Sequence, residues 1–302
     1  MIYKKCELCP RKCGADRTVS HGYCGQTDEI RIARAAPHFW EEPCLSGENG
    51  SGTVFFCGCT LGCVYCQNAA ISRGNTAEHG KAVTVAELAD IFLKLQNIGV
   101  HNINLVTPTM FSPSISEAID IARTRGLTLP IVYNTSGYET ADGLSHVADK
   151  IDIYLPDFKY ISPDIAKKYS RADDYPTYAK ASLSYMVNKI GFAEFDGDGI
   201  MTRGTVVRHL LLPGQLHESK RVLDYLFSEY GNSIYYSLMS QYTPVSALDK
   251  AAYPELARRV TTYEYQKLID HALALGIKNG FIQDGAAAKE SFIPKFNGEI
   301  PS

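Results

Sequence analysis

From residue 51 onward, short runs of apolar and β-branched residues alternate with longer segments whose apolar positions recur at helical spacing. This alternation is typical of a parallel sheet covered by helices. The predicted strands span residues 53–58, 102–107, 130–135, 152–157, 205–212 and 234–241. Six strand–helix units within roughly 230 residues predict an α/β fold, a partial (β/α)6 TIM-like barrel.

The segments between these runs carry helix start and stop signals. Thr84 and Glu87 form a capping box ahead of an apolar helical stripe, which Gly99 ends. A Ser-Pro pair opens two further helices, at residues 112–113 and 162–163. The last predicted helices span residues 217–230 and 263–275.

The first 50 residues have no clear hydrophobic period. Residues 1–50 are therefore predicted to form a small cysteine-rich metal segment, separate from a barrel with a C-terminal extension at residues 51–302. The Gly- and Ser-rich stretch 46–52 between them is typical of a flexible joint.

Composition narrows the function classes. The chain of 302 residues is 45% hydrophobic, with a net charge of -3 and a pI of about 6.2. This charge favours a protein or small-molecule partner over nucleic acid. No apolar run reaches the roughly 18 residues of a membrane span, and residues 1–5 carry no signal peptide. We expect a cytoplasmic protein with no membrane contact.

All nine cysteines lie within the first 66 residues. By chance this would happen about once in a million sequences, so the clustering needs a cause. A disulfide framework suits short secreted domains, which this chain does not resemble. Metal binding in a reducing cytosol is the favoured interpretation.

Three of these cysteines, Cys59, Cys63 and Cys66, follow the first predicted strand with three and then two intervening residues. Four thiolates would saturate an iron–sulfur cubane, whereas three leave one iron open for a ligand. The alternative is a zinc knuckle that lacks one ligand. Cys57 lies inside an apolar run and is predicted to be a buried structural thiol, and Cys44 has no partner at ligand spacing.

This Cys-x-x-x-Cys-x-x-Cys loop, with Tyr65 before its last cysteine, resembles that of the radical S-adenosylmethionine (SAM) superfamily. The resemblance implies a [4Fe-4S] cluster whose open iron binds the amino and carboxylate groups of SAM. One electron then splits SAM into methionine and a 5′-deoxyadenosyl radical. It also implies a flavodoxin- or ferredoxin-type reductant.

Within the superfamily the chain resembles the pyruvate formate-lyase activating enzyme-like subgroup with a long cysteine-rich N-terminus. Cys66-Gln67-Asn68 matches the subgroup's Cys-x-Asn, and the similarity runs along the whole chain. Thr107-Pro108-Thr109 departs from the Gly-Gly-Glu-type stretch that lines the SAM amino group in true activases. The resemblance implies an oxidoreductase that abstracts hydrogen, with a protein glycine as one target. Radical modification of a peptide or small molecule, and a non-catalytic iron–sulfur electron carrier, are the alternatives.

Polar residues follow the third and fourth predicted strands, where barrel enzymes place their chemistry. Asn134 and Ser136 resemble the family's Thr-Asn-Gly segment near the SAM ribose, although both are also ordinary turn residues. Asp157 and Lys159 resemble the family's Asp-x-Lys and would point to the same side of a strand. They could bind SAM or simply form an ion pair.

Arg208 lies among apolar residues and needs a carboxylate if it is buried. That carboxylate could belong to SAM, to a substrate acid or to a structural Asp or Glu. His209 points to the opposite side and is predicted to be structural. Gln241, Gln283 and Asp284 are further candidates for substrate contact.

Cys6, Cys9, Cys13 and Cys24 make a second set of four thiols. Four soft ligands suit a closed zinc site or a fully ligated iron–sulfur cluster, and zinc is preferred because short segments with little core are a common zinc context. Related proteins with the long N-terminus carry a similar Cys-x-x-Cys-Pro segment. We expect the metal to act as a structural clamp.

Overall fold

The computed structural model describes residues 2–72, 76–282, 296 and 298–301. Within them, ten strands form one sheet, in the order β10-β9-β8-β6-β5-β4-β2-β1-β3, with β7 paired to β8. The strands from β2 to β10 along this order are parallel. They are β2 (Ser51–Phe56), β4 (Ile103–Val106), β5 (Ile131–Thr135), β6 (Ile153–Pro156), β8 (Met201–Leu210), β9 (Tyr235–Met239) and β10 (Gly280–Ile282).

The α/β fold of the sequence analysis is confirmed, and each of the six predicted strands coincides with a strand of this parallel run. The sequence pattern did not show β10 or the short antiparallel strands β3 (Lys81–Val83) and β7 (Glu194–Phe195). Two or three residues are too few for a period to show.

Strand β1 (Ile30–His38) was also missed, and it lies antiparallel to β2, with Ala36 opposite Thr53. Part of the first 50 residues therefore extends the sheet, while the division at residue 50 into separate units stays a prediction. The expected flexible joint at 46–52 is wrong. Residues there belong to helix α1 (Pro43–Ser46) and to buried β2, and Gly50, at φ 82°, makes the turn between them.

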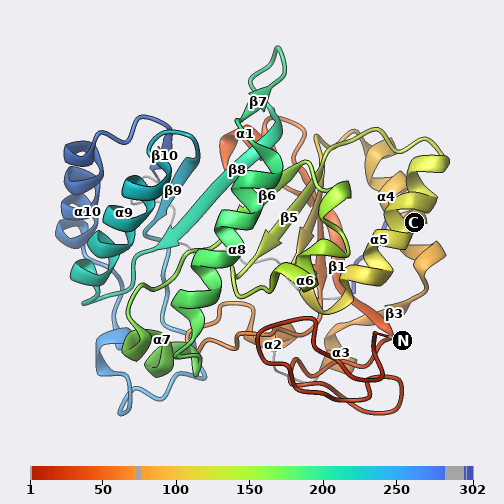
Figure 1. Cartoon of the computed structure of the whole chain (residues 1–302), viewed down its shortest axis with the longest axis horizontal. Helices are drawn as coiled ribbons and strands as arrows, with labels where there is room; N and C mark the ends of the chain where they lie inside the picture. The colour runs from red at the N-terminus through yellow and green to blue at the C-terminus, as the bar shows by residue number, and fades with distance from the viewer. Residues whose placement is uncertain (1, 73–75, 283–295, 297, 302) are drawn as a thin grey trace.

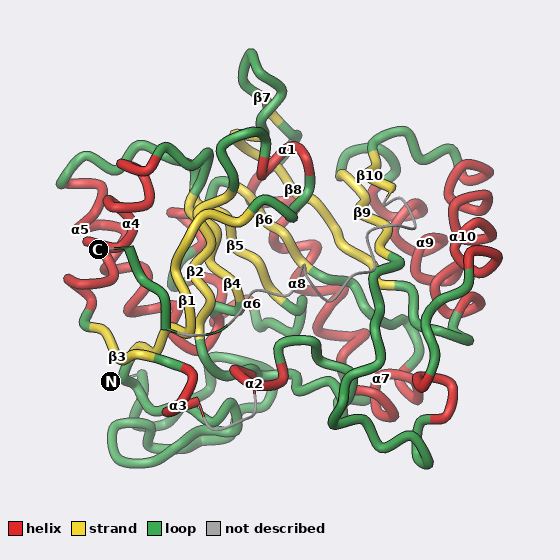
Figure 2. Tube along the Cα trace, turned by 180° about the vertical axis from the view of Figure 1, so that it is seen from behind, coloured by secondary structure: helices red, strands yellow, loops and turns green. Residues whose placement is uncertain are grey.

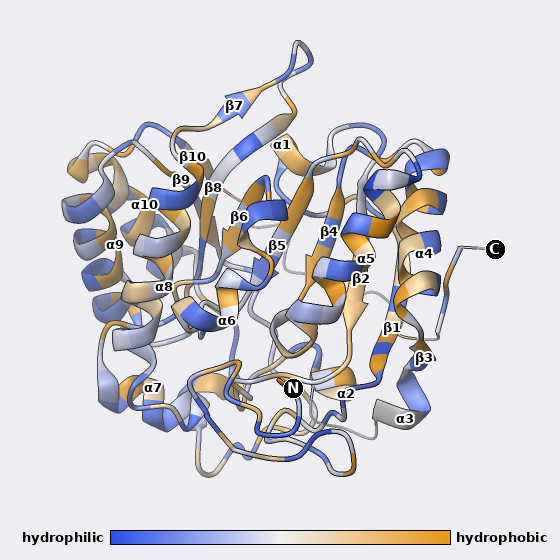
Figure 3. Ribbon diagram, turned by 45° about the vertical axis from the view of Figure 1, so that its right-hand side comes forward, coloured by the Kyte–Doolittle hydropathy of each residue, from blue (hydrophilic) through white to orange (hydrophobic). Residues whose placement is uncertain are grey.

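The helices lie on the outer side of the curved sheet (Figure 2). The predicted capping box is present at Thr84, where α4 begins, and Thr261 forms a second box with Glu264 at the start of α10. In Figure 3 the strands are largely apolar and the helices turn polar residues outward. The longer helices are α4 (Val85–Ile98), α5 (Ser112–Thr124), α7 (Pro163–Ser170), α8 (Tyr175–Ile190), α9 (Leu216–Tyr230) and α10 (Thr262–Leu275). No helix in the described part of the chain is both long and apolar enough to span a bilayer.

Residues 39–46 close the amino end of the parallel strands. His38 pairs with Ser51, the first residue of β2, so the chain leaves β1 at this end. Cys44 and Leu45 then pack against side chains of β5, β6 and β8. This packing turns residues 39–42 toward the space enclosed by the sheet.

Residues 2–29, here called the cysteine segment, contain no helix or strand. They lie beside the short helices α2 (Ala69–Ser72) and α3 (Thr76–His79), at the carboxyl end of the strands (Figure 1). Tyr3 Oη and Ser114 Oγ are 3.0 Å apart, and Thr140 Oγ1 donates to Leu8 O at 3.3 Å. The segment thus packs over the end of the sheet where barrel enzymes hold their active sites.

Candidate active site

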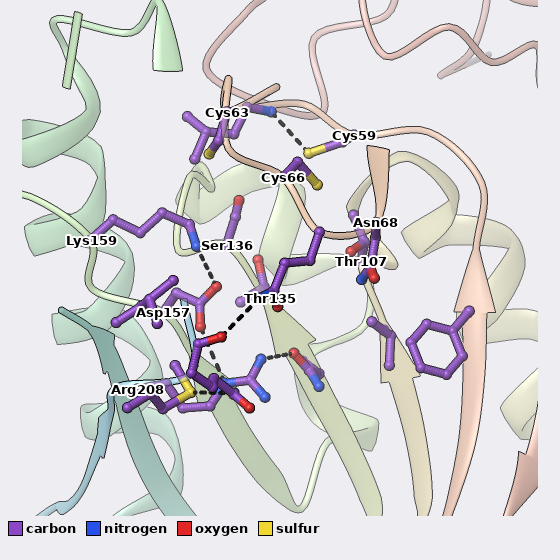
Figure 4. Close-up of a pocket in the computed structure, with 18 of the residues that line it drawn as sticks. Cys59, Cys63, Cys66, Asn68, Thr107, Thr135, Ser136, Asp157, Lys159 and Arg208 are labelled. Atoms are coloured by element: carbon purple, nitrogen blue, oxygen red, sulfur yellow. Dashed lines mark hydrogen bonds and ion pairs between the residues drawn. The ribbon is translucent and has the colours of Figure 1, made fainter. Parts of the chain in front are cut away.

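A cavity of roughly 260 Å³ lies inside the curved sheet and reaches its carboxyl end. Figure 4 shows the three cysteines of the loop after β2 at one end of the cavity and Arg208 of β8 toward the other. Every residue of the cluster loop and strand ends that the sequence predicted for cluster or SAM binding lines this cavity: Cys59, Cys63, Tyr65, Cys66, Asn68, Thr107, Asn134, Ser136, Asp157, Lys159 and Arg208. Their roles as ligands stay predictions.

Each thiol of the loop has a hydrogen-bond donor. The Leu61 amide donates to Cys59 Sγ at 3.4 Å, Ser170 Oγ to Cys63 Sγ at 3.0 Å, and Ser72 Oγ to Cys66 Sγ at 3.5 Å. Such donors favour the anionic form of sulfur, which is the form that ligates iron.

The donor set fits an iron–sulfur cubane. Burial raises the pKa of the Cys66 thiol to about 12, and the sulfurs of Cys59 and Cys63 add to the shift. Three neighbouring thiolates therefore need a cation to hold them. Within the described residues no three His, Cys, Asp or Glu side chains converge on a position for one ion. A cubane does not require this, because each of the three cysteines binds a different iron.

Arg208 is held by protein groups on three sides. Its Nε donates to Asp157 Oδ1 and its Nη1 to Glu41 Oε2, each at 3.1 Å. Its Nη2 donates to Asn134 Oδ1. The carboxylate that Arg208 needs is therefore supplied by the protein itself, by Asp157 and also by Glu41.

Lys159 shares Asp157 with Arg208, since its Nζ donates to Asp157 Oδ2 at 2.6 Å. Burial alone would raise the pKa of Asp157, but the two cations hold it below its usual value. The expected pairing of Asp157 with Lys159 is thus present in the cavity, as part of a larger charge network.

Glu41 is a cavity residue that the sequence analysis missed. It stands 167 positions before Arg208 and reaches it because residues 39–42 cross the amino end of the sheet. Burial raises the pKa of Glu41 and of its neighbour Glu42, and Arg208 opposes the shift. No local pattern in the sequence signals this contact.

Thr107 carries backbone strain at the cavity wall. Its φ is 58°, a left-handed conformation that β-branched residues rarely adopt, and its amide donates to Asn134 O at 2.8 Å. Strain of this kind concentrates at functional sites. The segment in which the sequence departs from the activase pattern therefore has a specialised backbone.

Glu139 is a second acid that the sequence analysis missed. It accepts hydrogen bonds from Thr109 Oγ1 at 2.6 Å and from Thr135 Oγ1, and Thr135 lines the cavity. Burial raises the pKa of Glu139 to about 7. The Glu139 carboxyl group, which lies behind the cavity wall, therefore changes its protonation state near neutral pH.

The other candidate residues lie both inside and outside the cavity. Tyr65 is buried, with its Oη 2.6 Å from Tyr160 Oη, and Gln241 lines the cavity. His209 faces away from the cavity, and its Nδ1 lies 2.7 Å from Phe158 O, as a structural histidine would. Cys57 is fully buried among apolar side chains, which confirms that expectation. Gln283 and Asp284 lie outside the described residues.

Comparison with known proteins gives the site a context. The family model described as "Radical SAM superfamily" matches residues 53–226. A curated relative, the uncharacterized protein MJ0674 of Methanocaldococcus jannaschii, is 27% identical over 278 residues, which cover 90% of this chain and 75% of the relative.

Two solved structures are similar in fold. SuiB of Streptococcus suis aligns with a TM-score of 0.53 at 12% identity, over 76% of this chain and 47% of SuiB. SuiB bound to its precursor peptide SuiA aligns with a TM-score of 0.50 at 13% identity, over 74% of this chain and 46% of SuiB. The chain thus spans about half the length of these structural relatives, and the likeness shows the fold alone.

Proposed function

Since the chain belongs to the radical SAM superfamily, whose family model matches more than half of it, we propose that it abstracts hydrogen from a substrate with a 5′-deoxyadenosyl radical. The cavity carries this proposal. It joins three thiols to polar residues from four strand ends, among them Thr107, Asn134 and Asp157. An electron carrier has no need of such a cavity, which counts against that alternative.

The chain's own residues divide the work. Cys59, Cys63 and Cys66 would hold a [4Fe-4S] cluster, which supplies the electron that cleaves SAM. Asn68, Thr107, Asn134 and Ser136 offer polar groups to SAM along the cavity wall. The buried ring of Tyr65 helps to exclude water from the thiols.

For the substrate we propose a protein glycine, as in an activase of a glycyl radical enzyme, on the resemblance of the Cys66-Gln67-Asn68 segment. A peptide or a small molecule modified by the same radical is the alternative. The exchange of Gly-Gly-Glu for Thr107-Pro108-Thr109 is the feature that separates this chain from true activases. A flavodoxin- or ferredoxin-type reductant, an absence of nucleic-acid partners and a cytoplasmic location belong to the same proposal.

Reconstituted wild-type protein reduced with dithionite should convert SAM to methionine and 5′-deoxyadenosine. Liquid chromatography with mass spectrometry measures both products. The enzyme should then be incubated with deuterated candidate proteins or deuterated extracts. Transfer of deuterium from one of these to 5′-deoxyadenosine would identify the substrate. Protein with an intact cluster that yields neither product would contradict the proposal.

We also propose a second metal at Cys6, Cys9, Cys13 and Cys24. Arg17 supports it: its side chain is fully buried, its Nη1 lies 3.7 Å from Cys6 Sγ, and no carboxylate pairs with it within the described residues. A metal bound to four thiolates would supply the missing negative charge. Zinc is the metal we propose here, because closed four-thiolate sites in short segments with little core are a common zinc context, and a fully ligated iron–sulfur cluster is the alternative.

A Cys59/Cys63/Cys66 triple alanine variant isolates this second site. Purified without oxygen, it should retain near-stoichiometric zinc and no iron at residues 6–24, and metal analysis measures both. Iron with acid-labile sulfide would instead show an auxiliary iron–sulfur cluster. Protein free of any metal would contradict the site.

A further inference from the structure

One side chain connects the cysteine segment to the catalytic loop. Arg11 stands between Cys9 and Cys13, and its Nε donates to Thr60 O at 3.0 Å. Its Nη2 donates to Leu61 O, also at 3.0 Å. Both carbonyls belong to the three residues between the first two cluster cysteines.

The same guanidinium contacts the carboxyl end of α7, where Ser170 lies against Cys63. Arg11 Nη1 donates to Arg171 O at 2.8 Å and Nη2 to Ser170 O at 3.2 Å. Ser170 is the residue whose hydroxyl donates to Cys63 Sγ. The Arg11 guanidinium thus holds the backbone between Cys59 and Cys63. It also holds Ser170, whose hydroxyl donates to Cys63 Sγ.

Two aromatic rings also contact the guanidinium. Its carbon lies 4.4 Å from the centre of the Tyr23 ring and 5.1 Å from that of Tyr138. Tyr23 directly precedes Cys24, so this stacking joins both halves of the four-cysteine set to Arg11.

Two buried carbonyls of the catalytic loop accept hydrogen bonds from Arg11. Residues 57–68 contain no helix or strand, yet Thr60 and Leu61 are buried, so their carbonyls need donors. The loop also has backbone bonds from Cys57 N to Arg31 O at 2.9 Å, from Gly58 N to Ile71 O at 2.8 Å, from Val64 N to Tyr169 O at 2.8 Å and from Cys66 N to Cys63 O at 3.3 Å. A hydrogen bond from a charged donor is stronger than one between neutral groups.

We infer that the metal-bound cysteine segment braces the catalytic cluster through Arg11. Arg11 is a positioning residue: it holds the Cys59–Cys63 backbone and keeps Ser170 in place to donate to Cys63 Sγ. Loss of the second metal would withdraw this brace and loosen the catalytic loop. The inference rests on the proposed function for the assignment of the catalytic cluster and the second metal.

The first test uses full-length Arg11→Ala, with Lys12→Ala as the matched control, because Lys12 is the exposed neighbour within the same cysteine pair. In reconstituted protein that holds both metals, hydrogen exchange of the Val64 amide should be at least tenfold faster in Arg11→Ala than in wild type or in the control. Arg11→Lys should rescue only partly, because an ammonium cannot reach four carbonyls in the plane of a guanidinium. Unchanged exchange in Arg11→Ala would overturn the brace.

The second test uses reconstituted protein. Arg11→Ala should lose cluster iron to a chelator several-fold faster than wild type, and its cluster potential should be lower, because a hydrogen bond to sulfur favours the reduced cluster. Cys24→Ala should produce the same two changes, and the Arg11→Ala/Cys24→Ala double variant should be no worse than either single variant. Additive defects would overturn the link between metal and brace.

The two proposals fail in different ways. Wild type that holds a full cluster but leaves SAM intact contradicts the proposed function and leaves the exchange result unaffected. Arg11→Ala that keeps cluster, potential and Val64 protection contradicts the brace, while the wild type still cleaves SAM. Melting of the control and variant proteins shows whether any change reflects global unfolding.

Discussion

Replacement of Cys59, Cys63 or Cys66 by alanine should reduce SAM cleavage to the level of a protein-free control. Each thiol is one of only three that the cavity offers to the cluster, and two thiolates do not hold a cubane against chelation. Each variant should also lose the iron and sulfide assigned to this loop. Quantification of 5′-deoxyadenosine, together with metal analysis, measures both effects.

Cys57→Ala is the matched control for this series. Cys57 lies two residues before Cys59 but packs among Ala33, Phe55, Ile71 and Val106, where a small apolar side chain replaces a thiol at modest cost. The control should keep its cluster and its activity. A Cys63→Ala protein that cleaves SAM at the wild-type rate would remove the basis of the ligand assignment.

The strands and helix ends could be predicted because their signals are local. Four of the six residues in the run Asn102–Thr107 are apolar or β-branched, and its central four residues form buried β4. Thr84 and Glu87 lie three positions apart, and that spacing alone specifies the box at the start of α4. β1 was missed because alternating Ile and Arg residues within it do not reveal an antiparallel partner.

The cavity was predictable for the same reason and only in part. Parallel strands bring their carboxyl ends together, so residues directly after them, such as Asn134 and Asp157, had to meet. Glu41, Arg11 and Ser170 reach the site from segments whose placement depends on tertiary packing. Their types and positions in the sequence carry no sign of this.

Arg208→Ala should lower the free energy of unfolding by about 3–5 kcal/mol, the usual cost of removing one partner from a buried ionic network. The side chains of Arg208, Glu41 and Asp157 are 16%, 8% and 18% exposed, so water can do little for the carboxylates left behind. Urea unfolding of metal-free protein at neutral pH measures the change.

Two further variants separate the structural role of Arg208 from ligand binding. Glu41→Gln removes one of the charges that Arg208 neutralises, so the Arg208→Ala/Glu41→Gln double variant should be clearly more stable than the sum of the single losses predicts. SAM affinity of reconstituted Arg208→Ala should fall only in proportion to the disturbance of Asn134, which loses its contact with Nη2. Unchanged stability combined with a tenfold or larger loss of SAM affinity would instead assign the guanidinium to the carboxylate of the ligand. In that case the ion pairs of Arg208 would not stabilise the fold.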